Sequence, residues 1–417
     1  MRDEVPARLA EAQLDALVVI GPGQHNPAMV YLLGRPTALT DAVLIYPREG
    51  EALLFHSPME RDAAAQTGLP TRGFDRYPFT RYLKQHNGDR FRARVARWRD
   101  ILRDVGLAQS RFAVVGRVEF SHGWSLWQAL AHELPKAQIL GREGWNALAA
   151  ARMRKGPEEV EAIRRVGRAT VAIVDRTRAW LRQLYAADDG RVVDAQGQTV
   201  TIGHVKRRIR RWLAEADLEI PHGLIFAQGR DAGVPHNPGN PEQPLYVGQT
   251  IVFDIFPQEA GGGYFYDFTR TWVLGRATEE QKRLHHHVRV AFERALARTR
   301  AGEAWEAPYL AAAEYLESHG HPTLRTRSGT QTGFVHSLGH GLGLEIHEDP
   351  RLMAGATQPL EPGMVVTIEP GLYYPNRGLG FRLEDTVWIR DDGQAEILVP
   401  YPYDLEIPLA NLGPTTA

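Results

Sequence analysis

The sequence predicts an α+β protein with two domains. The larger, C-terminal domain is built on a strongly curved antiparallel sheet, and a smaller α/β domain precedes it. Three observations support this prediction. The chain has 417 residues, which is more than one ordinary hydrophobic core accommodates. Short apolar runs alternate with helical patterns up to about residue 150. From residue 251 onward, apolar strands are separated by turns instead.

The composition excludes several classes of protein. Hydrophobic residues make up 43% of the chain and charged residues 24%, as in ordinary globular proteins. The formal net charge of −1 gives no reason to expect nucleic acid or an anionic membrane as a partner. The absence of cysteine excludes disulfides, zinc–thiolate sites and thiol nucleophiles. The first residues lack a signal-peptide pattern, and no apolar run reaches the ~18 residues of a membrane span, so we expect a cytoplasmic protein.

The first domain, residues 1–150, contains most of the α/β pattern. Its expected strands are short apolar runs at 17–20, 41–46, 52–55 and 112–116. The segment 81–103 is rich in arginine and tryptophan, and we expect an exposed helix or loop there.

The second domain, residues 151–417, begins with a helix signal. Pro157 is followed by Glu158 and Glu159, and proline with acids in the first turn is typical of a helix start. Apolar residues then recur at helical spacing from Val160 to Ile173. Further along, residues 278–281 (TEEQ) form a capping box that predicts another helix.

Residues 335–348, VHSLGHGLGLEIHE, combine histidines with glycines in this domain. His336, His340 and His347 lie four and seven positions apart, and His340 has a glycine on each side. Histidine can ligate a metal or move a proton, and glycine lets the backbone approach a ligand closely. A buried strand with satisfied polar side chains would also account for these residues alone. The interpretation therefore depends on carboxylates elsewhere in the chain.

Four acidic residues lie in or at the ends of apolar strands of the same domain: Asp254, Asp267, Glu369 and Glu384. A hairpin around the glycines at 261–263 can bring Asp254 and Asp267 side by side. Two carboxylates in apolar strands repel each other unless a cation holds them or one stays protonated. Each acid taken alone could instead cap a turn or pair with Arg270 or Arg382.

Four carboxylates and one imidazole form a hard, oxygen-rich donor set. Such a set suits two divalent ions of the manganese, cobalt, iron or zinc type that share bridging carboxylates. A two-metal centre can carry a hydroxide at neutral pH. We expect manganese first, with cobalt, zinc or iron as the alternatives.

The order and surroundings of these residues resemble the pita-bread metallopeptidases, which include aminopeptidase P, prolidase and methionyl aminopeptidase. The ligand order of that family is Asp, Asp, His, Glu, Glu, and the matching residues here are Asp254, Asp267, His340, Glu369 and Glu384. Four motifs match as well: YDFTRT at 266–271, GHGLG at 339–343, TIEPG at 367–371 and RLED at 382–385. The resemblance covers about residues 150–405. A smaller domain before the catalytic one is typical of the proline-specific branch and of creatinase.

The resemblance implies a role for each ligand. Asp254 would chelate one ion, His340 and Glu369 the other, and Asp267 and Glu384 would bridge the two. A hydroxide between the ions would attack the scissile carbonyl. Glu369 would also pass a proton to the leaving nitrogen.

The resemblance also implies residues that contact the substrate. His236, in the segment AQGRDAGVPH at 227–236, and His347 would hydrogen-bond the substrate and stabilise the oxyanion. His336 and Arg382 resemble substrate contacts of the proline-specific branch. Hydrogen bonding within the core would also account for His236 and His336.

The implied function is that of a two-metal Xaa-Pro peptidase, either an aminopeptidase P or a prolidase, acting on short peptides with proline second. The alternatives are a creatinase-like amidinohydrolase and an inactive peptide-binding protein. Members with this N-terminal domain are often dimers, so we expect a homodimer. One feature departs from the family pattern: the turn between Asp254 and Asp267 is two residues longer than usual. An even insertion keeps both acids on one side of the strands.

Overall fold

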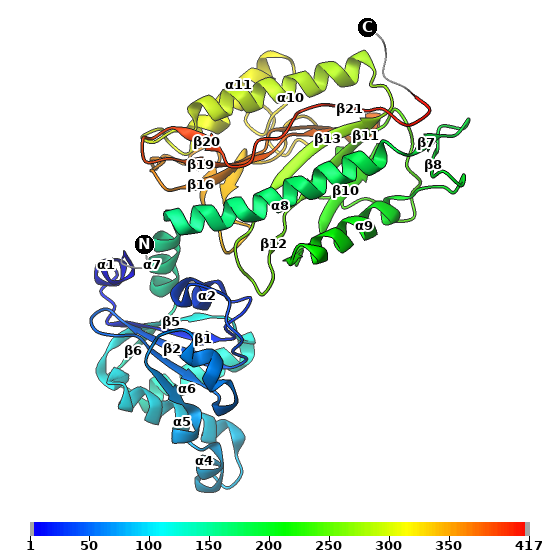
Figure 1. The fold of residues 1–417 in the computed structure, drawn as a ribbon. Helices are drawn as coiled ribbons and strands as arrows, with labels where there is room; N and C mark the ends of the chain where they lie inside the picture. Colours follow the sequence, from blue (N-terminus) through cyan, green and yellow to red (C-terminus); the bar gives the residue numbers. More distant parts are fainter. Residues whose placement is uncertain (1–3, 413–417) are drawn as a thin grey trace. The chain divides into compact units, whose positions relative to one another are not determined.

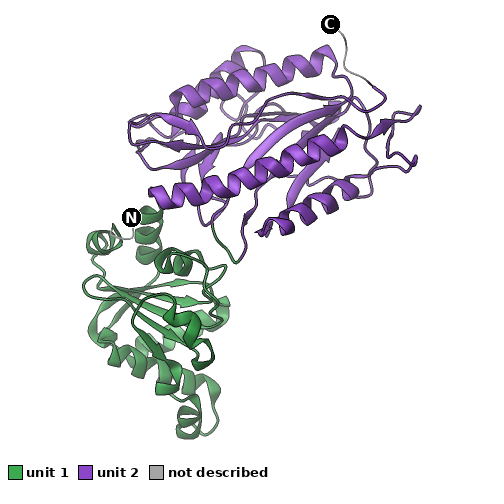
Figure 2. Cartoon of the chain, in the orientation of Figure 1, with its two compact units in different colours: residues 1–152, 261–263 green, residues 153–260, 264–417 purple. Residues whose placement is uncertain are grey.

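The computed structural model describes residues 4–412, which divide into two compact units (Figures 1 and 2). Unit 1 comprises the chain up to Arg152 together with Gly261–Gly263, and unit 2 comprises Met153–Ala260 and the chain from Tyr264 onward. The mixture of an α/β unit and a larger unit of antiparallel sheets and helices confirms the predicted fold class. None of the described helices is long and apolar enough to cross a membrane.

Unit 1 is a six-stranded sheet with helices around it, in the strand order β4-β3-β2-β1-β5-β6. Its strands are β1 (Ala16–Gly21), β2 (Ala42–Pro47), β3 (Leu53–His56), β4 (Thr71–Gly73), β5 (Arg111–Gly116) and β6 (Gln138–Leu140). Its helices are α1 (Glu4–Glu11), α2 (Pro27–Leu33), α3 (Arg61–Ala65), α4 (Phe79–Gln85), α5 (Arg90–Asp104), α6 (Phe120–Glu133) and α7 (Arg142–Met153), whose last residue belongs to unit 2. Strand β1 pairs parallel with β5 and antiparallel with β2, so the sheet is mixed.

The arginine-rich segment 81–103 is amphipathic and not simply exposed. It forms most of α4 and of α5, and α5 buries Ala93, Val95 and Ile101 in the core of unit 1. The high arginine content conceals this apolar stripe, because long charged side chains cover the remaining faces of the helix.

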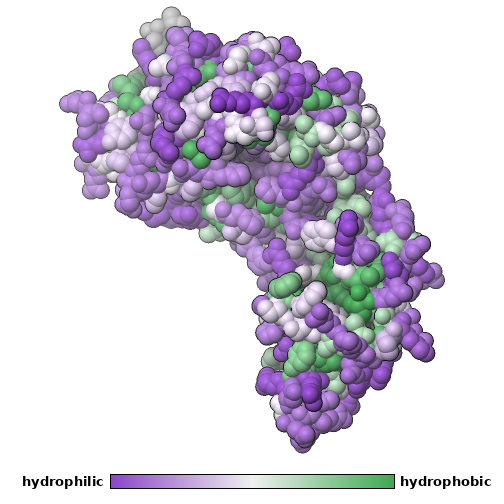
Figure 3. Space-filling view, turned by 180° about the vertical axis from the view of Figure 1, so that it is seen from behind, coloured by the Kyte–Doolittle hydropathy of each residue, from purple (hydrophilic) through white to green (hydrophobic). Residues whose placement is uncertain are grey.

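Unit 1 also exposes large hydrophobic side chains. Figure 3 shows hydrophobic patches on the smaller unit, although most of the visible face is hydrophilic. Phe120 and Trp124 are 77% and 58% exposed, and their rings stack with centroids 6.2 Å apart.

The central strands of unit 2 lie between two pairs of helices (Figure 1). The helices are α8 (Pro157–Leu181), α9 (Ile202–Glu215), α10 (Glu279–Arg298) and α11 (Glu306–Ser318). The strands in the first half are β7 (Tyr185–Ala186), β8 (Val192–Val193), β9 (Leu218–Glu219), β10 (Leu224–Gln228), β11 (Thr250–Ile255), β12 (Gln258–Glu259) and β13 (Phe268–Leu274). Those in the second half are β14 (Gly339–Gly341), β15 (Glu348–Leu352), β16 (Val365–Ile368), β17 (Gly371–Tyr374), β18 (Leu379–Arg382), β19 (Asp385–Ile389), β20 (Ala395–Ile397) and β21 (Glu406–Ile407).

Two sheets form the centre of unit 2, with the strand orders β10-β11-β13-β21 and β15-β14-β16-β19-β20. An isolated bridge between Thr269 and Glu384 joins them. Helices α8 and α9 share one hydrophobic core with the first sheet, and α10 and α11 share another with strands of the second. Both predicted helix starts are confirmed, because α8 begins at Pro157 and Thr278 caps α10.

Arg270 is a buried arginine that makes several hydrogen bonds beside the bridge between the two sheets. Its side chain is 1% exposed and donates to Asp385 Oδ1 at 2.9 Å. The guanidinium also donates to main-chain oxygens of Thr269, Glu384, Tyr401 and Pro402, at 2.9–3.0 Å. Arg270 therefore joins β13, the start of β19 and the chain before β21, and it holds the backbone of Glu384 in place.

Replacing Arg270 by methionine should lower the free energy of unfolding by about 3–5 kcal/mol, because the change leaves the buried Asp385 carboxylate without its cation. Arg211→Met is the matched control, since the Arg211 side chain is 80% exposed in its ion pair. The control should change stability by less than about 0.5 kcal/mol. Urea unfolding of both variants checks this, and equal effects would contradict the importance of the Arg270 contacts.

Candidate metal centre

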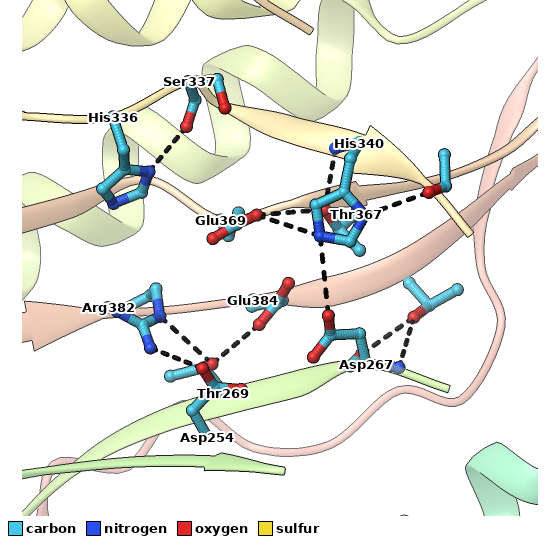
Figure 4. A network of polar contacts seen from close by, with 12 residues as sticks. Asp254, Asp267, Thr269, His336, Ser337, His340, Thr367, Glu369, Arg382 and Glu384 are labelled. Carbon is cyan, nitrogen blue, oxygen red and sulfur yellow. Dashed lines mark hydrogen bonds and ion pairs between the residues drawn. The ribbon is translucent and has the colours of Figure 1, made fainter. Parts of the chain in front are cut away.

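The first pair of acids approaches across neighbouring antiparallel strands. Asp254 lies in β11 opposite Thr269 of β13, and Asp267 directly precedes β13. The ring of Phe253 packs on the first core, with its centroid 5.3 Å from that of Trp272. Side chains alternate along a strand, so burying Phe253 on one face turns Asp254 to the other. Figure 4 shows Asp254 and Asp267 in the same polar cluster.

The other candidates come from the second sheet and its bridge. His340 is in β14, Glu369 directly follows β16, and Glu384 lies between β18 and β19. The amide of Glu369 donates to the oxygen of Leu338 at 2.8 Å, which holds this acid beside the histidine strand. Thus the five ligands expected from the sequence, scattered over 131 positions of the chain, come together in one cluster (Figure 4).

His340 has one ring nitrogen anchored and the other directed at carboxylates. Its Nδ1 is 3.0 Å from the oxygen of Gly341, where the ring N–H donates to the carbonyl. Its Nε2 lies 3.6 Å from Asp267 Oδ2 and 3.4 Å from Glu369 Oε1. Burial lowers the pKa of His340 to about 3, so the ring is neutral at neutral pH. A neutral imidazole fixed through one nitrogen is the usual form of a histidine metal ligand.

The clustered carboxyl groups suppress one another's ionisation. Burial, followed by the charge of Asp254, raises the pKa of Asp267 well above its ordinary value. Burial, followed by the charge of Asp267, does the same to Glu384. Burial raises the pKa of Glu369 to about 8, although Arg382 opposes the change. Without added positive charge, the folded protein therefore favours protons on this cluster.

The residues present fit a bound cation. Asp267, His340 and Glu384 each offer a ligand atom within 4.8 Å of the others. Among the described residues, Asp254 Oδ1 and Glu384 Oε1 are buried oxygens without a hydrogen-bond partner. Unpartnered buried carboxylate oxygens are costly unless a cation meets them.

Arg382 supplies positive charge beside the cluster. Its Nη2 donates to Asp254 Oδ2 at 2.5 Å, and Nη1 donates to Tyr373 Oη at 2.8 Å and to the oxygen of Pro235 at 3.2 Å. From the sequence, each of the four acids could have paired with Arg270 or Arg382. In the structure, Arg382 pairs with Asp254. Arg270 pairs with Asp385, which is none of the four candidates.

The remaining predicted histidines lie around the cluster. His347 is exposed, and its ring stands edge-on to that of His340 with centroids 4.4 Å apart. Partial desolvation of the ring, followed by the charges of Arg351 and His236, lowers the pKa of His347, which places both residues in its surroundings. His336 is half-buried, with Nε2 2.9 Å from Tyr373 Oη and Nδ1 2.6 Å from the oxygen of Ser337.

Several residues that hydrogen-bond to the site were not predicted from the sequence. Thr269 donates to Glu384 Oε2 at 2.7 Å, and Tyr373 contacts both His336 and Arg382. Thr367 Oγ1 accepts from the His340 amide at 3.1 Å. Period-two alternation could have flagged Thr269, because it lies in β13 two positions after Asp267. No comparable signal marks Tyr373, whose partners lie on other elements.

In metal-free protein, Glu369→Gln should stabilise the fold at pH 8 by about 1–3 kcal/mol, and by much less at pH 5. The folded pKa of Glu369 is raised from 4.5 to about 8. Its protonated form therefore favours folding below pH 4.5, and that contribution is lost as the pH rises to about 8. Glutamine does not titrate, so the difference between variant and wild type isolates this residue.

Urea unfolding in a chelator at pH 5 and pH 8 measures this difference. Glu293→Gln, at a site with 53% side-chain exposure on α10, serves as the control and should show no pH-dependent difference. A Glu369→Gln difference that grows toward pH 5 would contradict the raised pKa.

Known proteins share both the sequence pattern and the fold. A probable dipeptidase, PepE, of Mycobacterium tuberculosis is 29% identical over 318 residues, covering 76% of this chain and 77% of that one. An Xaa-Pro dipeptidase of Pyrococcus furiosus is 36% identical over 169 residues, covering 40% of this chain and 45% of that one. An X-Pro aminopeptidase structure from Thermotoga maritima has a TM-score of 0.74 at 21% identity, covering 97% of this chain and 100% of that one.

The family match covers the part of the chain that builds the cluster. Residues 161–391 match the model of metallopeptidase family M24, and this range includes all five clustered ligand candidates. The match spans more than half of the 417 residues. This chain therefore belongs to metallopeptidase family M24.

Proposed function

We propose that this protein is a two-metal Xaa-Pro peptidase that cleaves the bond between an N-terminal residue and a following proline. The observation that carries the proposal is the cluster of three buried carboxyl groups and the partly buried Glu369 with His340, whose Nε2 faces Asp267 and Glu369. The relatives named Xaa-Pro dipeptidase and X-Pro aminopeptidase support this choice of substrate. An intact ligand set argues against an inactive peptide-binding protein, and also against a metal-free amidinohydrolase.

The ligands are proposed to divide between two ions. Asp254 would hold one ion, His340 and Glu369 the other, and Asp267 and Glu384 would contact both. Bound divalent ions would supply Lewis acidity and a hydroxide nucleophile at neutral pH. Manganese stays the first expectation, with cobalt, zinc or iron as the alternatives. Arg382 would orient Asp254, because its guanidinium already donates to that carboxylate.

Glu369 is the proposed proton carrier. Its Oε1 lies 3.4 Å from His340 Nε2, so the carboxyl group stands beside the proposed ions, where it can take up the proton that a bound water loses. Its Oε1 also accepts from Thr367 Oγ1 at 3.4 Å, a contact that helps to fix the carboxyl group. We propose that Glu369 delivers a proton to the leaving prolyl nitrogen, which must be protonated as the peptide bond breaks.

His236 and His347 are the proposed oxyanion contacts. Both are exposed; the ring of His347 stands against that of His340, and the charge of His236 acts on His347. Exposed imidazoles beside a buried ligand can donate to a substrate carbonyl as negative charge develops on it. His336 and Arg382 bond mainly to protein partners, and their predicted substrate contacts stay predictions.

The length of the preferred peptide depends on what meets the carboxyl end of the substrate. Arg351 lies opposite His340 in the β14–β15 pair, and its charge acts on His347 and Glu369. A guanidinium in this position can pair with the terminal carboxylate of a dipeptide. Arg351 therefore supports cleavage of dipeptides alongside longer peptides. The expected homodimer and the cytoplasmic location stay predictions.

With Mn²⁺ added, the protein should hydrolyse Ala-Pro and Ala-Pro-Xaa peptides, and chelator-treated protein should hydrolyse neither. Ala-Ala and Ala-Ala-Xaa are the matched control substrates. Glu369→Ala should lower kcat by about 10²–10⁴-fold, because it removes both a ligand and the proton carrier. Quantifying released alanine gives the rates. Absence of metal-dependent cleavage by wild type would reject the proposed function, and unchanged turnover in the variant would reject the role of Glu369.

A further inference from the structure

A buried lysine lies far along the chain from the cluster and pairs with an acid next to His347. Lys155 sits between α7 and α8, and its side chain is 1% exposed. Its Nζ is 2.9 Å from Glu348 Oε2, and the Glu348 side chain is 8% exposed. The backbone of Lys155 is fixed as well, because its amide donates to the oxygen of Gly363 at 2.7 Å.

Glu348 is built into the turn that carries His347. Its Oε1 accepts from the amide of Glu345 at 3.1 Å, which closes residues 345–348 on themselves. Gly343 makes room for this carboxylate, since a Cβ at that position would lie 2.7 Å from Oε1 and 2.8 Å from Oε2. The glycine, the turn and the acid therefore form one packed unit beside His340.

A second acid completes the surroundings of Lys155. Burial raises the pKa of Glu159, while the charge of Lys155 opposes and that of Glu348 reinforces this shift, so all three groups are close. Tyr264 donates to Glu159 Oε1 at 2.5 Å. The next residue, Phe265, donates its amide to the oxygen of Gly343 at 2.8 Å. The same network thus reaches the strand that leads into Asp267.

We propose that Lys155 is a positioning residue that holds His347 in place through Glu348. The Lys155 ammonium holds the Glu348 carboxylate, and this carboxylate holds the segment 343–348. That segment carries His347, whose ring contacts the ring of His340. Breaking a buried ion pair costs far more than breaking an exposed one, so this anchor is rigid. The effect of Lys155 on catalysis rests on the proposed function and role of His347, whereas its anchoring of the turn does not.

Kinetics of variants test the catalytic consequence. Lys155→Met should lower kcat on Ala-Pro by about 10–100-fold with little change in KM, and Lys155→Arg should restore part of the loss. In a His347→Ala background, Lys155→Met should cost nothing further, because it acts through the missing ring. Equal losses in both backgrounds would overturn the proposal, since a general structural role is additive.

Hydrogen exchange tests the anchor without relying on activity. Amides of residues 343–348 should exchange faster in Lys155→Met, and at the wild-type rate in Glu161→Gln, whose exposed ion pair with Arg168 lies on α8, the helix that follows Lys155. The double variant Lys155→Met/Glu348→Gln removes both members of the buried pair and should show the same faster exchange if the single variant does not fold. Wild-type exchange in the folded variants would overturn the anchor. Failure of wild type to cleave peptides would instead reject the proposed function.

Discussion

The structure has to hold four mutually repelling carboxyl groups together in one domain. Their burial and their closeness raise the pKa values of Asp267, Glu369 and Glu384 together. Such a cluster persists only because other interactions in the domain enforce it, or because cations neutralise it. The two sheets hold the acids in place, and the guanidinium of Arg382 provides one fixed positive charge by pairing with Asp254.

Apolar packing and buried cationic side chains outside the cluster hold the acids together. Phe253 packs into one core and thereby turns Asp254 toward the site. Arg270 holds the backbone at Glu384 through hydrogen bonds that a hydrophobic residue could not make. Lys155 acts in the same way on the turn that carries His347. Repulsion at the centre is thus offset by fixed contacts around it, and the cluster stays ready to receive divalent ions.

Much of the site could be predicted from the sequence because its acids interrupt apolar strands. Burying an acid in an apolar strand costs free energy unless a cation or hydrogen bonds compensate, so Asp254 and Glu369 stand out in the sequence itself. Glycines on both sides of His340 gave a second signal. The partners that position these groups gave no signal. Tyr373, Lys155 and Thr269 are ordinary residues whose importance follows only from long-range contacts.

The fold was predictable to the same extent and for a related reason. Helix starts at Pro157 and Thr278 are encoded locally by caps, so they could be located well. The amphipathic nature of α5 was hidden, because arginine stems mask a narrow apolar stripe. The longer glycine turn after Asp254 is assigned to unit 1 at Gly261–Gly263, where the oxygen of Gly261 accepts from the His25 amide at 2.9 Å. Nothing in the local sequence of the turn indicates that partner.

Anomalous diffraction from crystals grown with Mn²⁺ tests the central claim most directly. The account predicts two anomalous peaks per chain inside the cluster, one contacting Asp254 and the other contacting His340 and Glu369. Asp267 and Glu384 should contact both peaks. A single peak, or ions that avoid these five residues, would contradict the two-metal centre.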